Sequence, residues 1–137
     1  MPDTQGVNHL GFAVRDLEST KRFFVECLGW QESGRDDSYP RTAVSDGVLR
    51  LTLWEVDHSL EVIPFNRRKT IGLHHLALTV PTEAALHRLA EKVTVWPDIK
   101  IEFQPELIGG GPRKHMIFCE PGGIRLEFIW SGTSNTE

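Results

Sequence analysis

Residues 124–130 of this chain read IRLEFIW, and residues 49–55 read LRLTLWE. Both stretches begin with an aliphatic residue, arginine and leucine, and both alternate apolar with polar side chains as a half-buried β-strand does. The match continues upstream without a gap, because SDGVLRLT at 45–52 aligns with EPGGIRLE at 120–127. The alignment indicates an internal repeat.

A second pair of matching stretches supports the repeat. HLGFAV at 9–14 and HLALTV at 75–80 share their apolar pattern and their leading histidine. Each is followed by a helix signal: Asp16 is placed to cap a helix over 17–28 that stops at Gly29, and Thr82 to cap a helix over 83–93. The apolar stripes expected to be buried are Leu17, Phe24 and Leu28 in the first helix and Leu86, Leu89 and Val93 in the second.

Three further extended segments follow each helix, joined by glycine turns at Asp46-Gly47 and Pro121-Gly122-Gly123. Each half therefore reads strand, helix, strand, strand, strand. We predict one α+β domain of two tandem βαβββ modules that form a cupped mixed sheet. The first module spans about 7–56, a linker about 57–71, and the second about 72–130. Neither half is long enough for a stable core of its own, so the halves must pack on each other or on another chain.

Composition excludes some classes of function. The 137 residues are 39% hydrophobic and 25% charged with a formal net charge of −4, which is typical of a soluble globular protein and argues against a nucleic-acid-binding surface. No apolar run approaches the roughly 20 residues of a membrane span, and no signal peptide is visible, so a cytoplasmic location is the default expectation. The basic run Arg67-Arg68-Lys69 is interpreted as a solvated linker, Cys27 and Cys119 as buried free thiols, and the polar tail 131–137 as disordered.

Three residues have the types and positions of a metal site. His9 and His75 open equivalent strands, and Glu127 lies centrally on the last strand. If a pseudo-twofold axis relates the modules, two imidazoles and a carboxylate meet at one point and suit Fe(II), Mn(II), Ni(II) or Zn(II). Thr52, the counterpart of Glu127, would leave one coordination position vacant. The alternative is that the histidines are hydrogen-bonded sheet-end residues and that Glu127 faces water.

Other polar residues are candidates for substrate binding. Arg125 shares the face of Glu127, and Arg113, Lys114 and His115 follow the glycine-rich loop at 109–111. An anionic substrate would favour such groups at the mouth of a site, although a solvated basic turn is the commoner explanation for such a run. Glu55 is expected on the opposite face from Thr52, and His74 is expected to point away from His75.

With these motifs together, the chain resembles the vicinal oxygen chelate superfamily of glyoxalases, bleomycin-resistance proteins and extradiol dioxygenases. The resemblance covers about residues 7–130 and is carried by VNHLGFAVRDLESTKRFFVECLGW, GLHHLALTV and IFCEPGGIRLEFIW. It implies paired βαβββ modules with eight strands, often in a homodimer. It also implies that His9, His75 and Glu127 are the metal ligands, with Thr52 at the position of the fourth ligand of glyoxalase I-like members.

The resemblance implies a small metalloenzyme in which a divalent cation acts as a Lewis acid on a small oxygen-bearing substrate, with Glu127 as the catalytic carboxylate. The reaction class stays open among lyase, isomerase, transferase and dioxygenase. One alternative is a metal-free protein that sequesters a ligand in an aromatic cleft, for which Trp30, Trp54, Trp96 and Trp130 are available. Another is a scaffold that has lost its metal.

Overall fold

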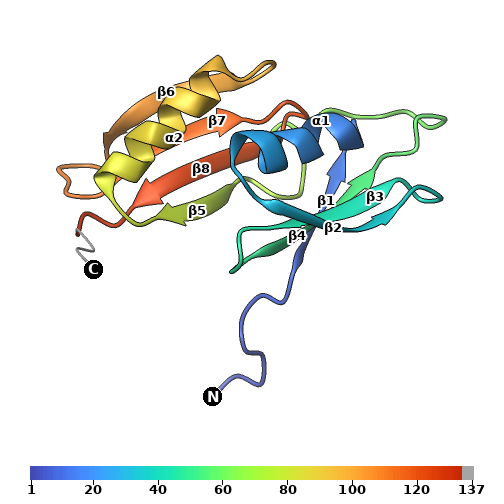
Figure 1. The fold of residues 1–137 in the computed structure, drawn as a ribbon, viewed down its shortest axis with the longest axis horizontal. Coiled ribbons are helices and arrows are strands. Elements are labelled where there is room, and N and C mark those ends of the chain that lie inside the picture. The colour runs from blue at the N-terminus through green and yellow to red at the C-terminus, as the bar shows by residue number, and fades with distance from the viewer. Residues whose placement is uncertain (134–137) are drawn as a thin grey trace. The chain divides into compact units, whose positions relative to one another are not determined.

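The computed structural model describes residues 1–133, and the chain divides into two compact units, one over Met1–Val62 and one from Ile63 onward. Each unit holds one four-stranded sheet and one helical segment (Figure 1). The elements of the first unit are β1 (Leu10–Val14), α1 (Leu17–Arg22), η1 (Phe23–Cys27), β2 (Gln31–Asp36), β3 (Arg41–Ser45) and β4 (Arg50–Glu55). Those of the second are β5 (Leu76–Val80), α2 (Glu83–Val95), β6 (Lys100–Leu107), β7 (Lys114–Cys119) and β8 (Arg125–Trp130).

The two sheets have the same topology. Their strand orders are β1-β4-β3-β2 and β5-β8-β7-β6, with the opening strand parallel to the closing strand and the other pairs antiparallel. The parallel pairs also share their register, because Gly11 is opposite Thr52 in one sheet and Ala77 is opposite Glu127 in the other. The predicted α+β fold of two tandem βαβββ modules is confirmed, and Thr52 and Glu127 occupy equivalent places.

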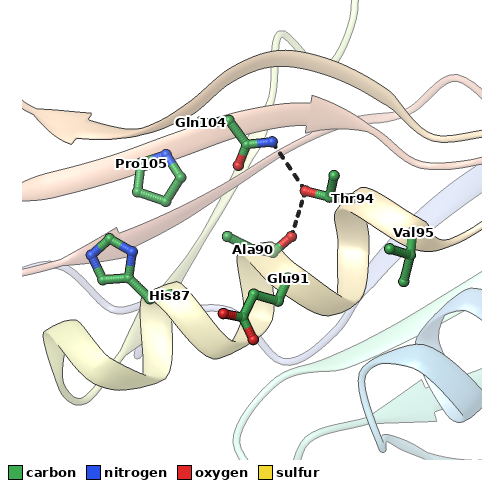
Figure 2. Close-up of a pocket in the computed structure, with 7 residues that line it drawn as sticks. All are labelled: His87, Ala90, Glu91, Thr94, Val95, Gln104 and Pro105. Carbon is green, nitrogen blue, oxygen red and sulfur yellow. Dashed lines mark hydrogen bonds between the residues drawn. The ribbon is translucent and has the colours of Figure 1, made fainter.

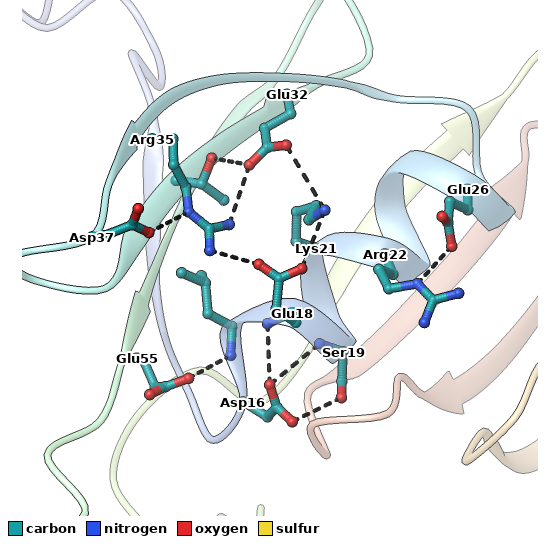
Figure 3. Close-up of polar contacts among 12 residues, drawn as sticks. Asp16, Glu18, Ser19, Lys21, Arg22, Glu26, Glu32, Arg35, Asp37 and Glu55 are labelled. Carbon is teal, nitrogen blue, oxygen red and sulfur yellow. Dashed lines mark hydrogen bonds and ion pairs between the residues drawn. The ribbon is translucent and has the colours of Figure 1, made fainter.

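The first helix begins where the sequence predicts. The Asp16 carboxylate accepts hydrogen bonds from the backbone N–H groups of Glu18 and Ser19. Glu55 accepts a further one from the N–H of Leu17 at 2.9 Å, so this glutamate points to the helix side of its sheet (Figure 3). The helical segment reaches Cys27 as expected, but its last five residues form a π-helical turn rather than an α-helical one.

Ion pairs fasten this helix to strand β2. Arg35 contacts Glu18 at 2.6 Å, and Lys21 lies 3.9 Å from Glu32 (Figure 3). The Thr42 hydroxyl donates to the same Glu32 carboxylate at 2.6 Å. The hydrogen bond from Arg35 holds the pKa of Glu18 below its ordinary value. Because these groups are largely exposed, they orient the helix more than they stabilise it.

The second helix is capped by Thr82, whose side chain accepts from the N–H of Ala85. Leu86 and Val93 are fully buried, as predicted, whereas Leu89 is only half-buried. Ala90 is buried in place of Leu89, so the buried face of α2 includes small residues that the predicted stripe did not. Within residues 1–133, no helix is both long and apolar enough to cross a bilayer.

The sheet of the second unit has a helix face and an open face. Met116, Phe118, Leu126 and Phe128 are buried on one side, and Lys114, which alternates with Met116, reaches Glu83 of α2. That side therefore faces the helix. The alternate residues His115, Ile117, Arg125 and Glu127 belong to the open face.

Candidate metal centre

Glu127 is the central acidic group of the open face. It lies in β8, opposite Ala77 of β5 and Ile117 of β7, and only 7% of its surface is exposed. A carboxylate held in such surroundings needs hydrogen-bond donors or a cation beside it, because desolvation disfavours an isolated charge.

Two histidines approach this carboxylate, one to each oxygen. His115 Nδ1 lies 2.5 Å from Oε2, and His75 Nε2 lies 3.3 Å from Oε1. Glu127 and His115 belong to the neighbouring strands β8 and β7, and His75 immediately precedes β5 on the other side of β8. The ring of Phe103 packs against that of His115 with centroids 4.8 Å apart, which restricts the imidazole's orientation.

The hydrogen bonds around His74 specify which nitrogen of His75 is protonated. Arg125 Nη1 lies 3.2 Å from His74 Nδ1, and arginine can only donate, so this Nδ1 accepts. His74 Nδ1 also lies 2.8 Å from His75 Nδ1, which must then be the N–H donor of that pair. The pKa of His74 is held below its ordinary value, first by desolvation and then by the charge of Arg125, which agrees with a neutral ring.

With its proton on Nδ1, His75 presents Nε2 to Glu127 as a lone pair when the ring is neutral and as an N–H donor when the ring is protonated. A nitrogen lone pair and a carboxylate oxygen repel each other unless a proton or a metal cation lies between them. An imidazole nitrogen and a carboxylate oxygen, here His75 Nε2 and Glu127 Oε1, are ligands of the types that bind Fe(II), Mn(II), Ni(II) or Zn(II). The residues therefore fit a divalent metal, although residues 1–133 contain no three metal-binding side chains already spaced around an ion.

Arg125 is held firmly beside this centre. Its Nε and Nη2 donate to the two oxygens of Glu102 at 2.9 and 2.6 Å, and its side chain is only 10% exposed. The pKa of Glu102 is lowered chiefly by the hydrogen bonds from Arg125. A continuous polar chain thus runs along the open face from His115 through Glu127, His75 and His74 to Arg125.

The other predicted site residues are placed as follows. Arg113 is exposed in the loop before β7, and Lys114 pairs with Glu83 on the helix face. Thr52 is buried and accepts a hydrogen bond from the indole N–H of Trp54 at 3.0 Å. His9 lies in the first unit, where its ring contacts the side chain of Asn8 at 2.8 Å. The meeting of His9 with His75 and Glu127 stays a prediction of the repeat.

Two features of the centre were not foreseen. His74 contacts both His75 and Arg125, so the expectation that it points away from His75 is wrong. It precedes β5 rather than lying in a strand, and strict alternation does not apply there. Glu102 is the second unforeseen feature, because no motif in the sequence marks it as a site residue. The alternation of polar and apolar residues in KIEFQ indicates only that it lies on the polar face of a strand.

The second unit also has a hollow of about 500 Å³, which lies between α2 and β6 (Figure 2). Two of its polar side chains are engaged within its wall: the Gln104 amide donates to the Thr94 hydroxyl, which donates to the Ala90 carbonyl. Because it is on the helix face, it does not reach Glu127. We therefore assign the chemistry to the open face.

The fold and this centre define a known class. The family model described as Glyoxalase/Bleomycin resistance protein/Dioxygenase superfamily matches residues 6–128, and the chain belongs to that superfamily. It is similar, at 26% identity over 94% of this chain and 81% of the relative, to a 2-epi-5-epi-valiolone epimerase from an Actinomyces species.

Solved structures agree on the fold. A glyoxylase/bleomycin resistance protein/dioxygenase domain from Frankia sp. EAN1pec has a TM-score of 0.79 at 25% identity, with 93% of each chain covered. A fosfomycin resistance protein from Listeria monocytogenes has a TM-score of 0.70 at 16% identity, covering 93% of this chain and 94% of its own. The latter similarity concerns the fold alone.

Proposed function

We propose that this chain is a metal-dependent enzyme that moves a proton on a carbon atom beside a carbonyl group of a small oxygen-bearing substrate, as in an epimerisation. The observation that carries the proposal is that the two oxygens of Glu127 each face a histidine nitrogen, one from His75 and one from His115. The similarity to a relative named as an epimerase favours this reaction class over the others that the superfamily allows.

His75 Nε2 and Glu127 would hold the cation, with His9 as the further ligand that the repeat predicts. A bound divalent cation supplies Lewis-acid polarisation of a carbonyl oxygen. The residues themselves fix its position: Arg125 orients His74, His74 accepts from His75 Nδ1, and this hydrogen bond keeps the Nε2 lone pair directed at Glu127.

His115 is the group proposed to carry the proton. Its Nδ1 is engaged with Glu127, and within residues 1–133 its Nε2 has no hydrogen-bond partner. A half-buried imidazole with one nitrogen free can accept a proton from a substrate carbon and return it, which is the role of a general acid–base group. Glu127, on the other nitrogen, fixes the ring's orientation and balances its positive charge when it is protonated.

Two measurements on the same preparations test the proposal. Elemental analysis after dialysis should find about one divalent ion per chain in the wild type and a large loss in His75→Ala and Glu127→Gln. Incubation with 2-epi-5-epi-valiolone in D2O, followed by proton NMR, should show deuterium entering the carbon beside the carbonyl. His115→Gln should retain metal and lose roughly 10²- to 10⁴-fold in exchange rate, the range for a general acid–base group.

The matched control is His87→Gln, which removes an exposed histidine of α2 outside the centre and should change neither measurement. Full metal retention in His75→Ala contradicts the ligand assignment. A wild-type protein that binds a ligand tightly with neither metal nor exchange would instead be a sequestering protein. Trp30 and Trp130 are buried, whereas Trp54 and Trp96 are partly exposed and are the tryptophans available to a ligand.

A further inference from the structure

A second hollow of the second unit, about 320 Å³, is lined by cationic side chains. We call it the cationic pocket, and its lining includes Arg67 and Arg68 from the linker, Lys100 from β6 and Arg125 from β8. Cys119 and Gly123 complete one side, and Phe65 and Asn66 the other. The basic run that the sequence suggested was a solvated linker therefore contributes two of its three cations to a cavity wall.

The charges in this pocket do not cancel. Glu102 is the acidic group that pairs there, with Arg125 at 2.6 Å and Arg67 at 3.4 Å. Within residues 1–133, Arg68 and Lys100 have no ion-pair partner. One carboxylate thus faces four cations, and three positive charges are left in excess. Cations gathered in this way repel one another, and a bound anion relieves the repulsion.

The donors also have free hydrogen-bonding capacity. A guanidinium has five N–H bonds, and Arg125 directs three at Glu102 and His74, which leaves two for a ligand. Its orientation is already set by those contacts, so little conformational entropy is lost on binding. Arg68 and Lys100 are exposed and approach from the linker and from β6, that is, from two further directions.

The register places the pocket beside the candidate metal centre. Lys100 is opposite Cys119, and Cys119 is opposite Arg125, so these residues form one row across the sheet. Glu127 follows Arg125 by two residues on the same strand and face. Two residues of strand span about 7 Å, so a group in the cationic pocket lies within the length of a small molecule from the metal centre.

The geometry points to a binding site for the phosphate group of a phosphorylated substrate, formed by Arg67, Arg68, Lys100 and Arg125. A phosphate monoester carries about two negative charges and three acceptor oxygens, which matches an excess of cations from several directions better than a carboxylate does. This assignment rests on the proposed function, which supplies the other end of the substrate, namely the carbonyl group that reacts at the metal centre. It narrows the substrate class: among small hydroxyketones, a phosphorylated one should be bound more tightly than an unphosphorylated one such as 2-epi-5-epi-valiolone.

The pocket itself is tested without metal, by titration calorimetry of the chelator-treated full chain with inorganic phosphate at low salt. Wild type should bind, and Arg68→Gln and Lys100→Gln should each weaken the affinity by roughly tenfold, the loss expected for one charge-assisted hydrogen bond. Both side chains are exposed, so the fold is retained. Lys69→Gln is the matched control, because Lys69 belongs to the same basic run but does not line the pocket. The phosphate affinity of this variant should stay within about twofold of the wild-type affinity.

A second titration, on metal-loaded protein, shows whether the pocket is specific for a phosphate ester or binds the free phosphate ion equally well. Dihydroxyacetone phosphate should bind at least tenfold more tightly than inorganic phosphate, and Glu127→Gln should remove this difference while leaving inorganic phosphate binding intact. Equal affinities for the ester and the free ion would overturn the substrate assignment in favour of a free-anion site. Absence of phosphate binding by the wild type, or equal affinity in Arg68→Gln and Lys69→Gln, would overturn the pocket.

The two proposals fail separately. Loss of phosphate affinity in the Arg68 and Lys100 variants, together with no metal uptake by the wild type, would retain the pocket and reject the metal enzyme. Normal metal uptake by the wild type, together with a phosphate affinity that is the same in the wild type and in these variants, would retain the metal enzyme and reject the pocket.

Discussion

Replacing Arg125 by methionine removes a guanidinium that is 10% exposed and that donates two hydrogen bonds to Glu102, which is 31% exposed. Exposed ion pairs contribute about 0–1 kcal/mol, whereas removing one partner of a buried pair costs about 3–5 kcal/mol. The Arg125–Glu102 pair lies between these limits. We expect Arg125→Met to lower the free energy of unfolding of the second unit by about 2 kcal/mol at neutral pH.

The pH dependence follows from the direction of the pKa change. Arg125 holds the pKa of Glu102 below its ordinary value of 4.5, so the pair stabilises the fold above that pH. The contribution is lost as the pH falls through the lowered pKa of the folded state, when the carboxylate is protonated. The cost of Arg125→Met should therefore shrink between about pH 5 and pH 3.

Carbon-13 NMR of labelled glutamate carboxyls would measure the titration of Glu102 directly. Urea unfolding followed by tryptophan fluorescence would give the free energy of unfolding. The Glu102 signal should titrate at higher pH in Arg125→Met than in wild type. Arg88→Met, on the exposed side of α2, is the control and should change neither quantity. A destabilisation that stays constant down to pH 3, with an unchanged Glu102 titration, would refute the reasoning.

Three further substitutions test the fold by urea unfolding. Asp16→Ala removes the cap of α1 and should cost about 1 kcal/mol; no measurable change would show that Glu55 suffices as the cap. Thr52→Val leaves the Trp54 indole N–H without its acceptor and should cost about 1 kcal/mol with altered tryptophan emission, whereas unchanged emission would contradict that hydrogen bond. Leu86→Ala opens a cavity under α2 and should cost about 2–5 kcal/mol, against almost nothing for the exposed Leu60→Ala; similar costs for both would refute the assigned core.

The sequence was most informative where a repeat constrains it. The alignment of His9 with His75 and of Thr52 with Glu127 predicts equivalent positions in the two modules, and the two parallel strand pairs indeed have the same register. Alternation along β8 likewise placed Arg125 and Glu127 on one face. These features follow from backbone geometry, which a short pattern encodes directly.

The rest depends on packing that a linear pattern does not contain. His74 lies outside a strand, so its contact with His75 could not be read from alternation. Arg67 and Arg68 are exposed, as predicted for the linker, but their place in one pocket with Lys100 and Arg125 could not be predicted, because those two residues are distant in sequence. The contact of His115 with Glu127 needed the β7–β8 register, which depends on the length of the connecting turn.

Matching registers in the two sheets have one more consequence. In the first sheet the hydroxyl of Thr52 is already satisfied by an indole, so this strand keeps its place without any acidic group. The place that Glu127 holds in the second module is thus taken in the first by a residue engaged within its own sheet, while His9 of the same module remains the predicted third ligand. A glutamate introduced at position 52 would have to replace the hydroxyl as the acceptor of the Trp54 indole.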